Sequence, residues 1–255
     1  MTSGGDWMLA EPGAGMPRDL DMGRPSAGAE RRFTSTIART IPTGGLLGAV
    51  MLELDHVFCV VDDLDHTAAL LEQDGWVLDA GTVHTGQGTR NRRLLWPEHY
   101  LELLRVVDPS EAFANPLRLD RRAEWRSTGA SPFGLVLRGQ LADRQRQHFI
   151  AYDDLGPRLW VHRDNLEAPA RPQVFVFETA EHELERRRPR SRRPRVLPPG
   201  RNGALQEVHV RGPEPARLPP QTGPMVLQVT GAHHLELVVG ARPAWPITEI
   251  LTIRG

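Results

Sequence analysis

The chain has 255 residues, 40% of them hydrophobic, which is enough for one large domain or two small ones with a packed core. A formal net charge of -1 argues against a function that depends on binding nucleic acid or acidic membranes. The single cysteine, Cys59, excludes an intramolecular disulfide and fits a reducing compartment. There is neither a long apolar run nor a signal-peptide pattern, so we expect a cytoplasmic protein with no membrane partner.

The first part of the chain has the composition of a disordered extension. Residues 1–50 are rich in Gly, Pro, Ser and paired opposite charges, and they show no sustained hydrophobic period. Periodic sequence begins at Met51. Translation from Met51 is therefore a hypothesis, which N-terminal sequencing of the native protein would test.

The pattern of residues 51–107 predicts a strand, a helix and three more strands. LELDHVFCVV has the alternation and β-branched residues of a strand. DLDHTAALLEQDG predicts a helix, because an aspartate can cap its start, apolar residues recur at helical spacing and Gly75 can end it. WVLDAGTV, RRLLWP and HYLELLRVV predict strands, with HTGQGTRN as a Gly-punctuated loop. We therefore expect a first βαβββ module over 51–107.

The rest of the chain is less regular. Residues 108–129 are predicted to be a partly helical connector, and 130–255 a second, degenerate module with strands at PFGLVLRG, RLWVHR, QVFVFE, LQEVHVRG, MVLQVTG, HHLELVVG and ITEILTIR. Residues 184–203 are Arg- and Pro-rich and predict an exposed loop. Acidic residues surround this loop and aromatic residues are absent from its arginine run, so no nucleic-acid partner is expected.

Two apolar strands carry a carboxylate at their centre, in YLELL and in HLELV. Side chains alternate along a strand, so Glu102 should share a face with Tyr100 and Leu104. That face is concave if Leu101 and Leu103 pack under the helices. A buried carboxylate is costly unless a metal ion or an arginine compensates its charge. Glu102 and Glu236 are therefore candidates for metal binding and catalysis.

The order of these segments resembles the glyoxalase-like branch of the vicinal oxygen chelate superfamily. The resemblance rests on LDHVFCVVDDLDHTAALLEQDGW, HTGQGTRN, YLELLRVVDP, PRLWVHRDN and QVFVFE, and it covers roughly residues 52–240. It implies an α+β fold of repeated βαβββ modules, whose curled mixed sheet forms a cup with helices on its outer face. It implies a small-molecule ligand and often a divalent metal ion. It implies no particular reaction, because this fold hosts isomerases, dioxygenases, antibiotic-modifying enzymes and plain binding proteins.

The resemblance also implies a set of metal ligands. His56 of the first strand joins Glu102, and Glu236 and Glu207 complete the set of His56, Glu102, Glu207 and Glu236. His209, which faces the same side as Glu207, is an alternative fourth ligand. Imidazole and carboxylate ligands suit Zn, Fe, Ni or Mn.

The fourth ligand depends on which strand opens the second module. If PFGLVLRG is the true equivalent of the first strand, its Phe133 and Gly134 cannot bind a metal. The site then has three protein ligands or no metal at all. Three ligands with a water molecule would still form a workable catalytic set.

Other polar and aromatic residues are candidates for contact with the substrate. They are His84, Thr89, Asn91, Tyr100 and Trp160. We expect lyase, isomerase or dioxygenase chemistry on a substrate with vicinal oxygens, in which Glu102 or Glu236 can leave the metal and act as a base. The alternative is a metal-free protein that binds or sequesters a small molecule, such as a drug, without catalysis. A homodimer is possible in either case.

Overall fold

The computed structural model describes residues 52–152, 159–179, 203–240 and 244–254. The predicted disordered extension, the hypothetical start at Met51 and all but the last residue of the Arg- and Pro-rich loop lie outside the described residues. Within the described part of the chain, no helix is long and apolar enough to cross a membrane. The fold is of the α+β class, with large mixed sheets and few helices.

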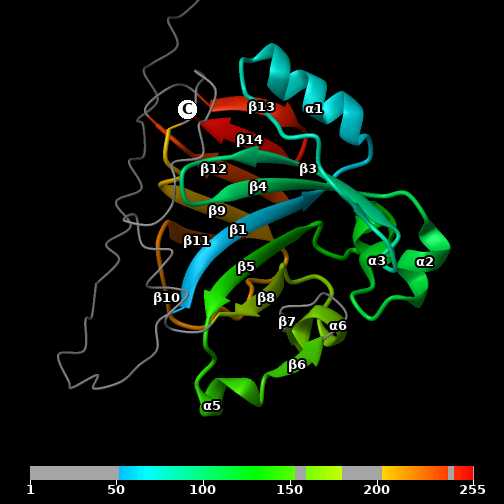
Figure 1. The fold of residues 1–255 in the computed structure, drawn as a ribbon, viewed down its shortest axis with the longest axis vertical. Helices are drawn as coiled ribbons and strands as arrows, with labels where there is room; N and C mark the ends of the chain where they lie inside the picture. Colours follow the sequence, from blue (N-terminus) through cyan, green and yellow to red (C-terminus); the bar gives the residue numbers. More distant parts are fainter. Residues whose placement is uncertain (1–51, 153–158, 180–202, 241–243, 255) are drawn as a thin grey trace, which may run out of the picture. The chain divides into compact units, whose positions relative to one another are not determined.

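The first sheet joins two βαβββ runs. The first run contains β1 (Leu52–Val60), α1 (Leu64–Gln73), β2 (Val83–His84), β3 (Thr89–Leu95) and β4 (Tyr100–Val106). The second contains β5 (Phe133–Gly139), α5 (Asp143–Arg146), β6 (Phe149–Tyr152), β7 (Leu159–His162) and β8 (Gln173–Glu178). The strand order is β2-β3-β4-β1-β5-β8-β7-β6, and antiparallel pairing of β1 with β5 connects the runs (Figure 1).

The connector between the runs contains short helices. They are α2 (Pro109–Ala114), α3 (Leu119–Ala123) and α4 (Trp125–Thr128), and α6 (Asp164–Glu167) follows β7. The side chain of Asp108 accepts hydrogen bonds from Ser110 N and Glu111 N and so caps α2. The side chain of Asp63 caps α1 in the same way, as the sequence predicted.

The C-terminal strands form a sheet of their own. It contains β11 (Met225–Thr230), β9 (Glu207–Gly212), β12 (His234–Val238), β14 (Leu251–Arg254) and β13 (Ala244–Thr248), in that order. The two-residue strand β10 (Gln221–Thr222) instead pairs with β1. The described part of 130–255, which the sequence predicted as one degenerate module, thus divides between two sheets. ITEILTIR also forms two strands rather than one edge strand, and the edge is β13.

A single apolar core lies between the two sheets. Leu52 and Leu54 of β1 lie in this core, and so do Val57 and Cys59, because the alternation changes phase at the register shift between Leu54 and His56. It also contains Leu64, Ala68 and Leu71 of α1, and Val208, Val210, Leu235 and Leu237 of the second sheet. The opposite face of the first sheet has a smaller cluster that includes Phe58 and Phe175. The first sheet thus has one face packed against α1 and the second sheet, and one face that is free to form a site.

The predicted strand WVLDAGTV is largely irregular. Only an isolated bridge between Leu78 and Leu94 and the two residues of β2 have strand pairing. The Asp79 side chain accepts from Gly81 N at 3.1 Å and from Arg93 N at 2.9 Å. Gly81 has φ +74°, and a Cβ there would lie 1.7 Å from the Asn91 carbonyl oxygen. The hydrogen bonds of the Asp79 side chain and the close approach of Gly81 to Asn91 take the place of regular strand pairing here.

Candidate functional site

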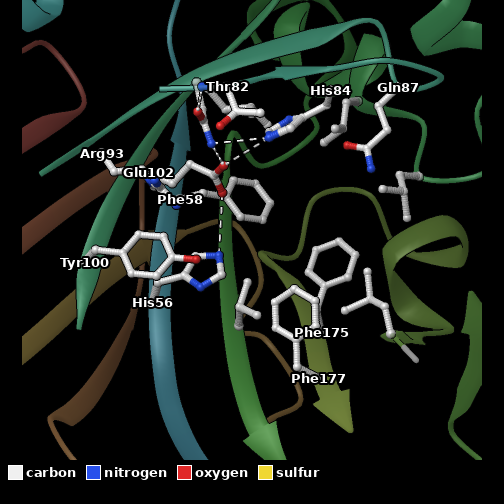
Figure 2. Close-up of a pocket in the computed structure, with 16 residues that line it drawn as sticks. His56, Phe58, Thr82, His84, Gln87, Arg93, Tyr100, Glu102, Phe175 and Phe177 are labelled. Carbon is white, nitrogen blue, oxygen red and sulfur yellow. Dashed lines mark hydrogen bonds and ion pairs between the residues drawn. The ribbon is translucent and has the colours of Figure 1, made fainter. Parts of the chain in front are cut away.

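A cavity of about 320 Å³ lies on the free face of the first sheet. One side of its lining is polar and contains His56, Thr82, His84, Gln87, Asn91, Arg93, Tyr100 and Glu102. The other side is apolar and contains Phe58, Leu104, Leu117, Leu119, Val136, Leu159, Phe175 and Phe177 (Figure 2). Such a division fits a ligand with an apolar body and at least one polar group.

His56 and Glu102 meet at the centre of the polar side. The parallel pairing of β1 with β4 sets His56 opposite Tyr100, and Phe58 opposite Glu102. The His56 Nε2 atom lies 3.5 Å from a Glu102 carboxylate oxygen. The His56 ring also stacks on Tyr100, with 4.1 Å between ring centroids. Leu101 and Leu103 belong to the buried core with the α1 residues, so Glu102 faces the cavity as the alternation predicted.

Behind His56 lies a chain of charged residues. The register of β1 against β5 shifts between Leu54 and His56, and His56 Nδ1 lies 2.8 Å from the carboxylate of Asp55, its sequence neighbour. Arg138, 4% exposed, donates to Asp55 at 3.0 Å and to Glu53 at 2.6 and 3.0 Å. A hydrogen bond at Nδ1 leaves Nε2 of His56 directed toward Glu102.

The pKa values of His56 and of the carboxylates beside it are shifted in opposite directions. Burial would raise the pKa of Glu102, but the hydrogen bond and charge of His56 outweigh it, and the pKa is lowered. Burial would lower the pKa of His56, but its bonds to Asp55 and Glu102 raise it. The pKa of Asp55 falls to about 2, against the effect of burial, because of His56 and Arg138. The surroundings of the pair therefore favour the charged form of both His56 and Glu102.

His84 and Asn91 add further polar groups from β2 and β3. The Asn91 carboxamide donates to Glu102, and its Nδ2 lies 3.3 Å from His84 Nε2. His84 Nε2 itself is 3.9 Å from Glu102. The Thr89 hydroxyl lies 3.0 Å from His84 Nδ1. The loop HTGQGTRN thus contributes three cavity residues, His84, Gln87 and Asn91, and Thr89, whose hydroxyl contacts the ring of His84.

Two of the predicted substrate contacts do not line the cavity. Thr89 is completely buried, and its hydroxyl is engaged with His84. Trp160 packs against the large core between the sheets, and its indole nitrogen donates to Glu178 at 3.1 Å. Thr89 and Trp160 are thus not among the residues that line the cavity, whereas His84, Asn91 and Tyr100 are.

The structure does not bring Glu207 and Glu236 to His56 and Glu102. Leu235 and Leu237 of β12 fill the shared core, so alternation turns Glu236 to the opposite face of the second sheet. Glu236 accepts there from Arg254, and His209 lies 2.6 Å from Glu207 and 3.9 Å from Glu236. These side chains form a second polar group, which does not line the cavity.

The donors at the cavity do not fit the divalent metal ion implied by the resemblance. Among the described residues, no group of three or more His, Cys, Asp or Glu side chains is arranged to hold a metal ion. The second run contributes Val136, Leu159, Phe175 and Phe177 to the cavity, and none of these can bind a metal. Phe133 and Gly134 do not line the cavity, and a Cβ on Gly134 would lie 2.0 Å from the Phe58 ring.

Sequence reasoning did not single out several residues that shape the site, although most of them lie within the expected motifs. They are Asp55, Phe58, Gln87, Arg138, Phe175 and Phe177. Alternation offered a signal for Phe58, which is two residues from His56 on the same strand. Asp55 could not be found in this way, because only the shift in register brings its side chain to the His56 ring.

Comparison with known proteins places the chain among glyoxalase-like proteins. Residues 54–234 match the family model of the glyoxalase-like domain. No curated protein matches the chain.

Solved structures share the fold at low sequence identity. A hypothetical protein from Staphylococcus aureus is 12% identical, with a TM-score of 0.50 over 80% of this chain and 99% of its own. Methylmalonyl-CoA epimerase from Mycobacterium tuberculosis is 19% identical, with a TM-score of 0.37 over 55% of this chain and 97% of its own. A methylmalonyl-CoA epimerase from Streptomyces coelicolor, with a bound CoA derivative, is 15% identical, with a TM-score of 0.37 over 52% of this chain and 99% of its own. At such identities these likenesses concern the fold alone.

Proposed function

Because the chain belongs to the glyoxalase-like domain family, we propose that it binds a small organic molecule in the cavity of the first sheet and catalyses proton transfer on it through Glu102 and His56. The observation that carries this proposal is the pair itself. A carboxylate with a lowered pKa and an imidazole with a raised pKa lie 3.5 Å apart and line the cavity. Two groups whose environments push their pKa values apart are suited to acid and base tasks.

In the proposed reaction Glu102 is the base. Its carboxylate removes a proton from a carbon next to a carbonyl group of the substrate. The imidazolium of His56 donates a hydrogen bond from Nε2 to the oxyanion of the resulting enolate, and the proton then returns from Glu102 to carbon. Asp55 holds the other nitrogen of His56 at 2.8 Å and stabilises the positive charge. This chemistry is that of an isomerase, or the first step of a lyase.

Metal chemistry is not part of this proposal, because the cavity draws its donors from one run only. Elemental analysis of the purified protein tests this directly. We expect no stoichiometric Zn, Fe, Ni or Mn. A stoichiometric metal ion that is lost from both His56→Ala and Glu102→Ala would show that the donor set had been misjudged.

Hydrogen exchange at carbon tests the proton transfer. The protein is incubated in deuterium oxide with a panel of small aryl-alkyl ketones and oxo acids, and deuterium incorporation next to the carbonyl is followed by NMR. We expect wild type to accelerate exchange of a panel member, and Glu102→Gln to lose about 10²-fold or more of that rate. Glu236→Gln is the matched control, because Glu236 lies on the second sheet and does not line the cavity. Equal rates for wild type and Glu102→Gln would exclude Glu102 as the base.

A binding protein without catalysis is the second candidate. The apolar side of the cavity favours it, since Val136, Phe175 and Phe177 offer shape and hydrophobic contact but no chemistry. Under this alternative a ligand binds equally well to wild type and Glu102→Gln, and no panel member exchanges faster than in buffer. A cytoplasmic setting and a homodimer stay predictions that support neither candidate over the other.

A further inference from the structure

Gln87 is a largely buried polar residue whose side chain has no hydrogen-bond partner in the part of the chain that the structure describes. It is 7% exposed and lines the cavity. Its backbone N–H donates to the carbonyl of His84 at 3.1 Å, but its carboxamide has no hydrogen-bond partner among the described residues. Figure 2 shows this carboxamide pointing into the cavity from the same rim as His84. The carboxamide atoms of Gln87 are not among the fully buried polar atoms that lack a partner, so they are open to the cavity, where a polar group of a bound ligand can pair with them.

The backbone around Gln87 is fixed by the connector. The Glu111 carboxylate accepts from Gly86 N at 2.5 Å and from Gly88 N at 2.7 Å. The Asn115 side chain donates to the Gly86 carbonyl at 2.6 Å. Gly88 has φ +65°, and a Cβ there would lie 2.2 Å from the Asp108 carbonyl oxygen. The residues on both sides of Gln87 are thus held against α2, so the carboxamide is presented to the cavity by a defined turn.

Gln87 and His56 lie at different ends of the polar lining of the cavity, with Glu102 and His84 between them (Figure 2). Apolar side chains, among them Leu117 and Leu119, complete the lining. A ligand that satisfies both polar sites therefore needs polar groups at two ends of an apolar body. A carboxamide presents a donor and an acceptor side by side, and its best complement is a group that presents an acceptor and a donor in the same way.

We propose that Gln87 is a specificity-determining residue that binds a carboxamide, lactam or imide group of the ligand, while the other end of the ligand contacts His56 and Glu102. This inference rests on the proposed function, since it requires that the cavity binds a small molecule. It adds the class of ligand, an apolar or aromatic body with an amide-type group at the end distant from the catalytic pair.

Three matched probes test the proposal. They are 3-(4-hydroxyphenyl)propanamide, 3-(4-hydroxyphenyl)propanoate and 4-propylphenol, which share a phenol head and differ in the group offered to Gln87. Dissociation constants are measured by titration calorimetry or ligand-observed NMR for wild type and Gln87→Met. We expect Gln87→Met to weaken binding of the amide by about 3- to 10-fold, the loss of one hydrogen bond, and to leave 4-propylphenol within about twofold.

Two further variants make the result specific. Gln73→Met makes the same substitution at an exposed position of α1 and should change no affinity. Gln87→Glu keeps the shape but removes the donor, so it should also weaken the amide, and it provides a second test should Gln87→Met fail to fold.

The outcomes separate this inference from the proposed function. Binding of the probes with no selective loss of the amide in the Gln87 variants overturns the role of Gln87 and leaves the cavity proposal intact. A larger loss for the propanoate than for the amide overturns the amide class. Failure of wild type to bind any of the three probes overturns the cavity proposal and this inference with it.

Discussion

The strands β4 and β12 carry nearly the same sequence, YLELL and HLELV, yet their carboxylates have different surroundings. In both strands the leucines on either side of the glutamate fill the shared core, and the glutamate points away from it. For Glu102, the side away from the core is a cavity with a second cluster of apolar residues. For Glu236 it is a face on which Arg254 and His209 are its neighbours. Alternation decides which face a side chain takes, but the rest of the fold decides what that face becomes.

Each sheet has an arginine that pairs with a carboxylate, but the two ion pairs differ in how deeply they are buried. This difference gives the largest expected effect of a substitution on stability. Arg138 is 4% exposed and is bonded to Glu53 and Asp55, whereas the Arg254 side chain is 43% exposed beside Glu236. Arg138→Met would leave Glu53 without its cation and Asp55 with His56 alone, so we expect a loss of about 3–5 kcal/mol in the free energy of unfolding. Arg254→Met should cost less than about 1 kcal/mol. Urea denaturation at neutral pH measures both. Similar losses in the two variants would contradict the distinction between a buried and an exposed ion pair.

The pH dependence of the unfolding free energy gives the second largest expected effect. The pKa of Asp55 is lowered to about 2 in the fold from its ordinary value of 3.8. A lowered carboxylate pKa stabilises the fold above the unfolded value, and this contribution is lost as pH falls through 3.8 toward 2. Its size is about 2 kcal/mol. The difference in unfolding free energy between wild type and Asp55→Asn should therefore be complete above about pH 5 and shrink toward pH 2.

The control for Asp55 is Asp143, whose side chain is fully exposed at the start of α5. Asp143→Asn should give a pH profile parallel to that of wild type. His56 acts with the opposite sign, because its pKa is raised. Its contribution is present below its ordinary pKa and is lost as pH rises through the raised value. If the difference in unfolding free energy between wild type and Asp55→Asn does not change with pH, the pKa of Asp55 is not lowered in the fold.

The sequence predicted those features that depend on local periodicity. Strand β1 and helix α1 with its Asp63 cap follow from alternation, helical spacing and capping, whereas the placing of His56 with Glu102 was implied by the family resemblance. The glyoxalase-like resemblance supplied the fold class, which the family match confirms. These predictions succeeded because each is decided by neighbours that are close along the chain.

The remaining features depend on contacts between distant segments. The similarity of the two LEL strands suggested that Glu236 belongs to the same site as Glu102, but the second run of the first sheet is formed by 133–178, and Glu236 lies in another sheet. Nothing local indicates that Gln87 lacks a partner or that Arg138 reaches Asp55, which is 83 residues away. The apolar half of the cavity was missed for the same reason, because Phe58 and Phe175 meet only when β5 and β8 join the sheet.

Two glycines give the smallest expected effect and the closest test of how the cavity is formed. A Cβ on Gly134 of β5 would lie 2.0 Å from the Phe58 ring, whereas on Gly212 of β9 the nearest atom, in His233, would be 3.4 Å away. Gly134→Ala should therefore cost roughly 1 kcal/mol, near the lower limit for overpacking, because the displaced atoms are the tip of a ring that borders the cavity. Gly212→Ala should change stability by less than about 0.5 kcal/mol. Thermal denaturation measures both effects.

The same pair of variants separates stability from binding. The Phe58 ring can leave the position above Gly134 only by moving toward the cavity or toward Phe175, 5.9 Å away between ring centroids. Gly134→Ala should therefore weaken binding of 4-propylphenol even where the protein remains folded, and Gly212→Ala should not. If Gly134→Ala binds the probe as wild type does, the Phe58 ring does not form the wall of the binding site. The apolar contribution would then come from Phe175 and Phe177 alone, and the glycine of β5 would serve packing rather than the ligand.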